Sequence, residues 1–298
     1  KVIADGHYPL ASDYREIFLA DNNTCKEIIW PLVQDGLRAQ SSAGTNFYVK
    51  AFVNGPMDEL YKTGVGSRGW GNVRAKVSLV DAFDADDVMF DGNDTWGNNK
   101  KDKRAQFMTA LPNQVKDTWD VNMDMTSTFT CGYGYIKWRN VTKEDELCPS
   151  GDAYTSIDFP LFRTADAYLM AAEAILRGAN GTQSEALGYV NEVRTRAYMS
   201  GKYAKNGVRS DVSGEITANE LNLDFLLVER QKELASELTR RTDLIRFGKY
   251  TKGNNWDWKN GVRLGADVDD KYNLFPIPES ELTNNPTLVQ NDGYKVMK

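Results

Sequence analysis

The chain has 298 residues, 41% of them hydrophobic, with 36 basic and 42 acidic side chains and a formal net charge of -6. Its charges are interspersed, so it lacks the basic patch that a nucleic-acid partner requires, and no apolar run approaches the roughly 20 residues of a membrane span. The length suits one large domain or two of ordinary size.

The beginning of the chain has no apolar signal core and no initiator Met. We therefore expect a fragment or a processed product. Three cysteines, Cys25, Cys131 and Cys148, are too few for a disulfide framework, and a Cys131–Cys148 pair stays an open alternative.

Residues 1–155 are rich in Gly, Asn, Asp and aromatic side chains, which favours long loops around short elements. Structured loops of this kind usually bind something, so we expect a ligand-binding region. The elements that we expect are one or two helical turns over Ser12–Leu19, a helix over Arg74–Phe83, loops over Gly64–Gly71 and Asp91–Asn99, and a hairpin or short strand within Thr126–Arg139.

Residues 156–298 are expected to form a helical spine and a C-terminal strap. Apolar residues at helical spacing predict a helix over about 162–177 and a second from Ser184 to near Gly201, joined as an antiparallel hairpin. The capping-box pattern Thr217–Glu220 is expected to open one long helix that ends near Phe247.

The last stretch, Phe275–Tyr294, contains three prolines, which exclude a long helix or a central strand. It is nevertheless apolar, with Phe275, Ile277, Leu282, Leu288 and Tyr294 along it. These residues predict anchors of a tail that lies across a preformed helical surface.

Three carboxylates, Glu229, Glu233 and Glu237, are spaced to share one helix face, where they would repel one another. We expect arginines of neighbouring helices to pair with them in an ionic network. A carboxylate metal site is the alternative, but such sites in helical bundles require a Glu-x-x-His motif, which is absent here.

Sequence signals for catalysis are weak. His7 is the single histidine and lies in a turn-like setting, and Gly64–Gly69 matches G-x-G-x-x-G without the strand that a dinucleotide fingerprint needs. Asp267–Asp270 lacks the glycine and glutamate of an EF-hand loop. A solvated loop is the favoured interpretation there, and a structural calcium ion remains an alternative.

Tryptophans in the loops are the strongest binding signal. Among Gly, Asn and Asp they suit a sugar, since the ring meets C–H faces and the polar groups bind hydroxyls. For any single Trp, packing on the core is the simpler interpretation, but at least one is expected to be a ligand platform. The set is Trp70, Trp96, Trp119, Trp138, Trp256 and Trp258.

Four blocks of the sequence resemble the C-terminal portion of SusD/RagB-type glycan-binding outer-membrane lipoproteins of Bacteroidetes. They are FPLFRTADAYLMAAEA from Phe159, VNEVRTRA from Val190, ERQKELASELTRRTDLIR from Glu229 and the tail from Phe275. A looser similarity over the first residues makes the resemblance nearly end to end.

Two departures stand out. Leu238 occupies a position where the family usually has glycine, and the Asp-x-Arg expected after the Trp70–Phe83 segment is weak, with Asp86-Asp87-Val88 in its place. The resemblance also implies that the family's lipidated start and first helical hairpins would precede Lys1.

The resemblance implies a mainly α fold, with a tetratricopeptide-like helical framework, long irregular loops and minor β hairpins, in a single SusD-like domain over residues 1–298. It implies no enzyme activity and no cofactor. It implies capture of a glycan at the extracellular face of the outer membrane, a SusC-like TonB-dependent transporter as partner, and a lipid anchor outside this chain. The expected glycan contacts are Trp70, Trp96 and Tyr48.

Two other functions remain open from sequence. One is a secreted glycoside hydrolase, for which two suitably placed carboxylates would be needed. The other is a helical protein–protein adaptor without affinity for sugars.

Overall fold

The computed structural model describes residues 2–41, 44–53, 58, 61–88, 99–108, 133–199, 212–253 and 255–295. The chain forms two compact units. The first comprises residues 1–75 and 79–237, and the second comprises residues 76–78 and 238–298.

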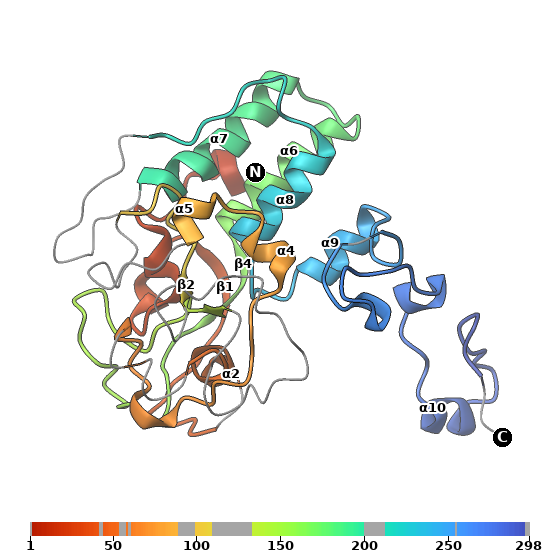
Figure 1. Ribbon diagram of the computed structural model, residues 1–298, viewed down its shortest axis with the longest axis horizontal. Helices are drawn as coiled ribbons and strands as arrows, with labels where there is room; N and C mark the ends of the chain where they lie inside the picture. Colours follow the sequence, from red (N-terminus) through yellow and green to blue (C-terminus); the bar gives the residue numbers. More distant parts are fainter. Residues whose placement is uncertain are drawn as a thin grey trace. The chain divides into compact units, whose positions relative to one another are not determined.

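Helices dominate the first unit (Figure 1), which confirms the mainly α prediction. The longer helices are α2 (Thr45–Ala51), α6 (Thr164–Leu176), α7 (Gln183–Met199) and α8 (Leu223–Glu233). Single turns are α1 (Val2–Asp5), α4 (Val77–Val80, at the boundary between the units) and α5 (Ala85–Val88), with 3-10 turns at Tyr14–Phe18, Asn22–Thr24 and Gly66–Arg68. The turn expected over Ser12–Leu19 is confirmed, whereas the helix expected over Arg74–Phe83 shortens to α4.

Two small antiparallel sheets complete this unit. β1 (Ile28–Leu32) pairs with β4 (Phe159–Arg163), and β2 (Phe107–Met108) pairs with β3 (Gly134–Tyr135). The helix expected over about 162–177 is confirmed as α6, which begins at Thr164 because residues 159–163 pair with β1.

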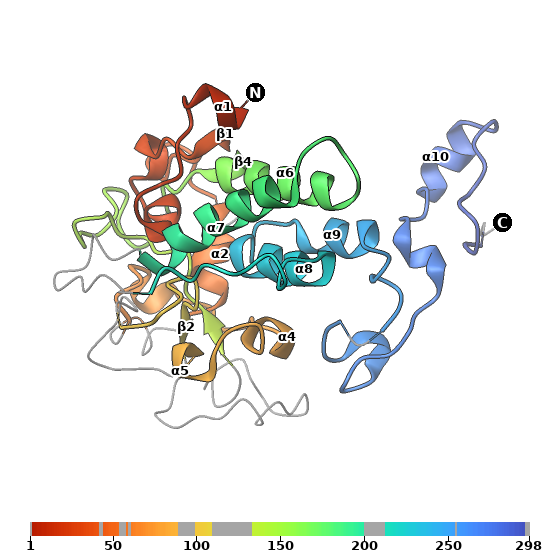
Figure 2. The same cartoon turned by 90° about the horizontal axis from the view of Figure 1, so that it is seen from above.

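The predicted helical hairpin is confirmed: α6 and α7 lie side by side, with α8 against α6 (Figure 2). The apolar stripe of α6 is buried at Ala165, Leu169 and Ala172, against Val190 and Val193 of α7. After α6 ends, the chain turns at Gly178, whose φ of 96° is a conformation that mainly glycine adopts.

The single long helix predicted from Thr217 to Phe247 was wrong. The Glu220 carboxylate accepts from the Thr217 amide, as in a capping box, and from the Thr217 hydroxyl, but the helix begins at Leu223, with Asn222 as its N-cap. It ends at Glu233, and α9 (Arg240–Arg246) follows in the second unit. Between them Ser236 and Leu238 have φ of 62° and 64°, so the backbone turns out of the helix there.

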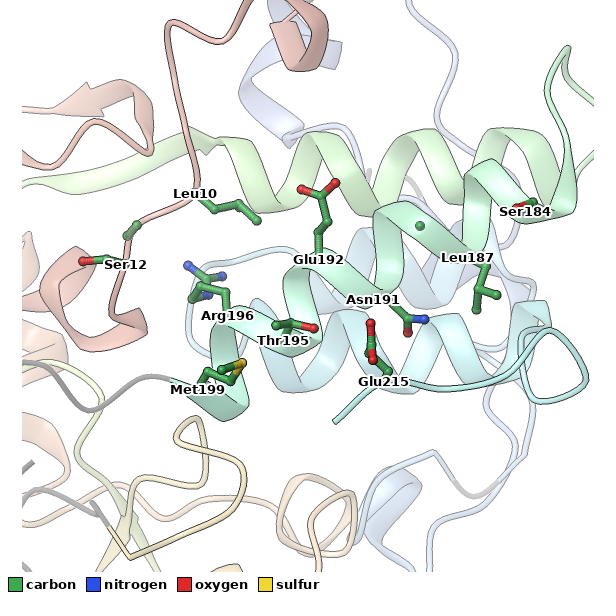
Figure 3. A pocket seen from close by; sticks show the side chains of 12 residues that line it. Leu10, Ser12, Ser184, Leu187, Asn191, Glu192, Thr195, Arg196, Met199 and Glu215 are labelled. Carbon is green, nitrogen blue, oxygen red and sulfur yellow. The ribbon is translucent and has the colours of Figure 1, made fainter. Parts of the chain in front are cut away.

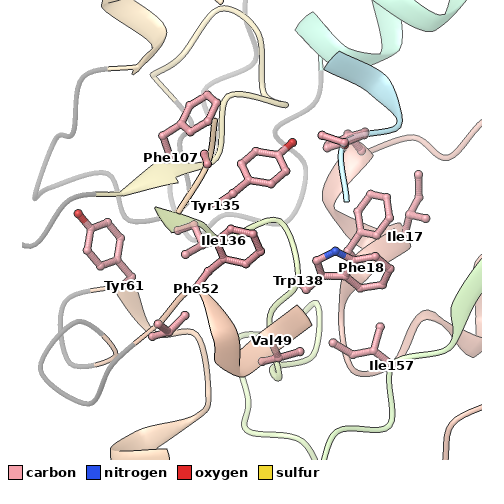
Figure 4. Packing of buried hydrophobic residues seen from close by; sticks show 14 of the residues in the cluster. Ile17, Phe18, Val49, Phe52, Tyr61, Phe107, Tyr135, Ile136, Trp138 and Ile157 are labelled. Atoms are coloured by element: carbon pink, nitrogen blue, oxygen red, sulfur yellow. The ribbon is translucent and has the colours of Figure 1, made fainter. Parts of the chain in front are cut away.

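The larger apolar cluster of the first unit lies among the short elements and loops of residues 11–159 and also includes Ala235 (Figure 4). Its members are mostly aromatic or β-branched, among them Phe18, Val49, Tyr135, Trp138 and Ile157. Trp138, one of the loop tryptophans, is 1% exposed and is therefore a core residue.

A buried ionic network connects this cluster to the helices. Glu233 of α8 accepts from Arg163 Nη1 at 2.6 Å and from Arg104 Nη1 at 3.1 Å, and it also binds Arg196. Among the described residues, five buried carboxylates pair with six buried cations: Glu27, Asp102, Glu229, Glu233 and Glu237 with Arg104, Lys137, Arg163, Arg194, Arg196 and Lys232. The network predicted around the three glutamates is thus confirmed, and it also includes residues that the sequence did not suggest.

Opposite charges hold these carboxyl groups ionised. Burial by itself would raise the pKa of Glu233, but the guanidinium groups of Arg196, Arg163 and Arg104 outweigh it and lower the pKa to about 2. Glu229 and Glu237 also have lowered pKa values, because their arginine and lysine partners outweigh the effect of burial. All three therefore carry a negative charge at neutral pH and need their partners.

The second unit contains α9, 3-10 turns at Lys259–Gly261 and Asp270–Asn273, and α10 (Glu279–Asn284). Its tail folds back on itself: the Gln290 side chain donates to and accepts from the Ile277 backbone, and Tyr294 Oη donates to the Leu274 carbonyl at 2.8 Å. Of the expected anchors, Ile277 and Leu282 are half-buried, whereas Phe275 and Leu288 are exposed, with Arg241 over the Phe275 ring.

Leu238 is an exposed side chain in a left-handed backbone conformation, which costs a non-glycine residue roughly 1 kcal/mol. We expect Leu238→Gly to raise the free energy of unfolding by up to about 1 kcal/mol, measured by urea denaturation. Leu264→Gly is the matched control, since Leu264 is equally exposed without a positive φ. A gain of the same size in the control would contradict the backbone explanation.

Glu233→Gln removes the charge that three arginines share. Because a buried pair that loses one partner leaves uncompensated charge, we expect a loss of about 3–5 kcal/mol in the free energy of unfolding. The exposed Glu281→Gln should change it by less than about 0.5 kcal/mol. Thermal and urea denaturation measure both, and a Glu233→Gln loss below about 1 kcal/mol would show that the network is not needed for stability.

Candidate functional site

Helix α2 is fixed to the core through its first turn. Thr45 Oγ1 donates to the Ile157 carbonyl at 2.8 Å, and the Asn46 side chain accepts from the Thr155 amide and donates to the Ser41 carbonyl. Both side chains are buried. The helix therefore presents its next two residues, Phe47 and Tyr48, in a defined orientation.

A row of aromatic rings leads from the core to the surface along this helix. Trp138 and Phe159 are stacked, with ring centroids 5.5 Å apart, and Tyr48 lies against both at 5.4 and 5.6 Å. Phe47 follows at 5.7 Å from Tyr48, and Trp70 at 6.1 Å from Phe47. Phe47 is 44% and Trp70 36% exposed, so the row ends in an open ring pair.

The loop that carries Trp70 is bound to the end of the same helix. The amides of Trp70, Gly71 and Asn72 donate to the carbonyls of Lys50, Val53 and Ala51, respectively. Lys50 and Ala51 are the last residues of α2, where carbonyls lack regular intrahelical partners, and Val53 lies just after the helix. Gly71 has φ of 60°, so the turn beside Trp70 needs a glycine.

Charged and polar residues occur in the chain close to the ring pair. Arg68, two residues before Trp70, forms a half-exposed ion pair with Asp152 at 3.0 Å. Lys50 lies on α2, donates to the Ala153 carbonyl, and has a pKa lowered by burial and by Arg68. Asn72 is exposed two residues after Trp70. Open rings can contact the C–H faces of a polyhydroxylated ligand, and Arg68 and Asn72 are exposed polar residues of the same loop as Trp70.

The structure brings two of the three predicted contacts together. Trp70 and Tyr48 belong to one ring row, joined through Phe47, whereas Trp96 lies outside the described residues. Tyr48 is half-buried, and burial raises the pKa of its hydroxyl. Sequence reasoning missed Phe47, because nothing in its local sequence distinguishes an exposed Phe from a core one.

A pocket of about 750 Å³ lies along α7, apart from the ring pair (Figure 3). It is lined by α7 side chains such as Leu187 and Thr195, together with Leu10 and Ser12. Two of its polar side chains already have partners within the protein: Asn191 forms hydrogen bonds with the Ile216 backbone, and Arg196 belongs to the buried ionic network. No aromatic ring lines it, so it suits a sugar less well than the ring pair does.

Within the described parts of the chain, no three His, Cys, Asp or Glu side chains are grouped to hold a metal ion. Asp267 accepts from the Gly253 amide, and Asp270 pairs with Thr251 and Lys252. His7 is exposed beside Asp5, as a surface histidine would be. Cys148 is free, and its proposed partner Cys131 lies outside the described residues.

No helix among the described residues is long and apolar enough to cross a bilayer.

Comparison with known proteins gives consistent matches. A family model described as the SusD family matches residues 26–294. The starch-binding protein SusD of Bacteroides thetaiotaomicron is 32% identical over 99% of this chain and 54% of its own length. The SusD-like protein P25 of Formosa agariphila is 26% identical over 98% of this chain and 53% of its own length.

Solved structures share the fold. Surface glycan-binding protein A from Bacteroides thetaiotaomicron, in complex with laminarihexaose, has a TM-score of 0.62 at 22% identity and covers 97% of this chain and 57% of its own. A SusD superfamily protein from Parabacteroides distasonis has a TM-score of 0.60 at 20% identity, with 98% and 55% covered. The chain thus spans about half the length of the relatives that it matches.

Gly71→Ala is expected to disturb the loop that holds Trp70. A Cβ in the left-handed conformation costs roughly 1 kcal/mol, so the free energy of unfolding should fall by about that amount. Gly69→Ala is the matched control in the same loop, since its φ of -66° accepts any residue. Urea denaturation compares the two, and equal effects would mean that the turn at Gly71 does not depend on glycine.

Proposed function

The chain belongs to the SusD family, and we propose that it binds a glycan at the cell surface without cleaving it, at the ring pair Phe47–Trp70. The observation that carries the proposal is that both rings are exposed yet fixed. α2 holds Phe47, and the hydrogen-bonded loop at the end of α2 holds Trp70. A preformed platform of this kind lowers the entropy cost of binding.

The relatives suggest the chemistry of the ligand. One is named a starch-binding protein, and another was solved with laminarihexaose, so gluco-oligosaccharides are the first class to test. We further propose that the full-length protein sits on the outer membrane through a lipid anchor and passes the glycan to a SusC-like TonB-dependent transporter. Both steps rest on family membership.

Hydrolysis is the less supported alternative. A glycosidase needs a carboxyl group of raised pKa facing a second carboxyl across the sugar. The buried carboxylates around Glu233 are paired and have lowered pKa values. Burial raises the pKa of Asp158, but its side chain is 5% exposed and accepts from the Gln34 amide. No described carboxyl pair is thus favoured for this chemistry.

Calorimetric titration with maltohexaose and laminarihexaose tests the proposal. We expect binding of at least one of them, and an affinity loss of about tenfold in Trp70→Ala and in Phe47→Ala, since one ring contact contributes roughly 1.4 kcal/mol. A reducing-sugar assay on the same mixtures should show no turnover.

Trp30→Ala is the matched control, because Trp30 is an exposed Trp of the same unit on β1. It should bind as the parent does. Unchanged affinity in both Trp70→Ala and Phe47→Ala would reject the ring pair as the site, and no binding of any glycan would favour a protein–protein adaptor.

A further inference from the structure

The segment that carries Trp70 is basic, although the chain as a whole has a formal net charge of -6. Residues 61–75 contain no acidic side chain. They contain three basic ones: Lys62, Arg68 and Arg74. Helix α2 adds Lys50 and likewise has no acidic residue. A local excess of positive charge raises the concentration of anions at that surface, so the surroundings of the ring pair suit an anionic ligand.

Two of these cations lie close together beside the ring pair. Lys50 follows Phe47 by three positions on α2, which makes the two residues neighbours on the helix surface, and its carbonyl accepts from the Trp70 amide at 2.9 Å. Arg68 is two residues before Trp70, so their Cα atoms are at most about 7 Å apart. Burial lowers the pKa of Lys50 and the charge of Arg68 lowers it further, whereas Asp152 raises it. One carboxylate thus serves two cations.

Arg68 is the cation that can contact a ligand. Its side chain is 55% exposed, and within the described residues it pairs with Asp152 through Nε, at 3.0 Å. The N–H groups on its two Nη atoms can therefore donate to a ligand, and a guanidinium matches the geometry of a carboxylate. Lys50 is only 6% exposed and donates to the Ala153 carbonyl. Lys50 thus adds positive charge to the site, while Arg68 can make the contact.

We propose that the Phe47–Trp70 pair binds a glycan that carries a carboxylate, as a uronic acid does, and that Arg68 binds this carboxylate. The inference rests on the proposed function, since it names the glycan class for the same ring pair. The rings contact the C–H faces of the sugar, and the acidic group lies on the guanidinium two residues away. A neutral glycan gains the ring contacts alone.

The test compares sugars that differ only in charge. The probes are maltohexaose and laminarihexaose, each as the neutral parent and as the form oxidised at C6 to glucuronic acid. Calorimetry is done at low ionic strength, because salt screens exposed charges. We expect at least one oxidised form to bind at least about tenfold more tightly than its parent, since a hydrogen bond to a charged group contributes about 1.4 kcal/mol or more. The negative net charge of the chain acts against this preference, so a general electrostatic effect does not produce it.

Three variants assign the preference to Arg68. Arg68→Gln should remove it and leave the affinity for the neutral parent unchanged. Asp152→Asn releases Arg68 from its partner and should strengthen binding of the oxidised form by about threefold, the worth of an exposed ion pair. Arg38→Gln is the matched control and should keep the preference, because Arg38 is also exposed and pairs with a single carboxylate, that of Asp35 at 3.6 Å.

The outcomes separate this inference from the proposed function. Binding of a neutral hexasaccharide without any preference for its oxidised form overturns the inference and leaves the proposed function standing, whereas binding of neither form overturns both. A preference that survives in Arg68→Gln also overturns the inference. Trp70→Ala should weaken both forms, and an oxidised form that binds it as tightly as the parent chain would place the acidic sugar away from the rings, against the inference.

Discussion

The buried carboxylate of Glu233 is the group on which the first unit depends. Its two oxygens face three arginines that come from α7, from the end of β4 and from the loop before β2. Each of these charged groups is buried, so removing one leaves its partners without compensation and destabilises the fold. The network therefore specifies one arrangement of segments that are far apart in the sequence.

The aromatic surface is built on residues next to this network. Trp138 follows Lys137, which pairs with Glu237, and Phe159 begins the strand that ends at Arg163. The Trp138–Phe159 stack supports Tyr48, Tyr48 supports Phe47, and the end of α2 holds Trp70. Fixed charges in the core thus place an open pair of rings at the surface through one continuous series of contacts.

Sequence predicted the elements whose signals are local. Helical spacing placed α6 and α7, and the spacing of Glu229, Glu233 and Glu237 predicted the ionic network. Sequence failed to predict strands that depend on distant parts of the chain. The register partners Leu32 of β1 and Phe159 of β4 are 127 residues apart in the sequence, and each strand contains a proline, which argues against a strand.

The break after α8 has a different reason. Leu238 has the left-handed backbone conformation that glycine usually adopts. Because this position holds Leu and not the family's usual glycine, the sequence carried no signal that the helix ends before it. In the candidate site, Trp70 and Tyr48 were expected from the sequence, whereas Phe47 joins them only through the packing of α2 against the loop that carries Trp70.

We propose that the core holds the Phe47–Trp70 pair in place before a glycan binds. A crystal structure of the chain soaked with the hexasaccharide that binds in calorimetry tests it most directly. We expect sugar rings over Phe47 and Trp70, with the backbone of α2 and of residues 70–73 displaced by less than about 1 Å. A sugar bound elsewhere, or bound only after α2 and this loop have moved apart, would contradict it.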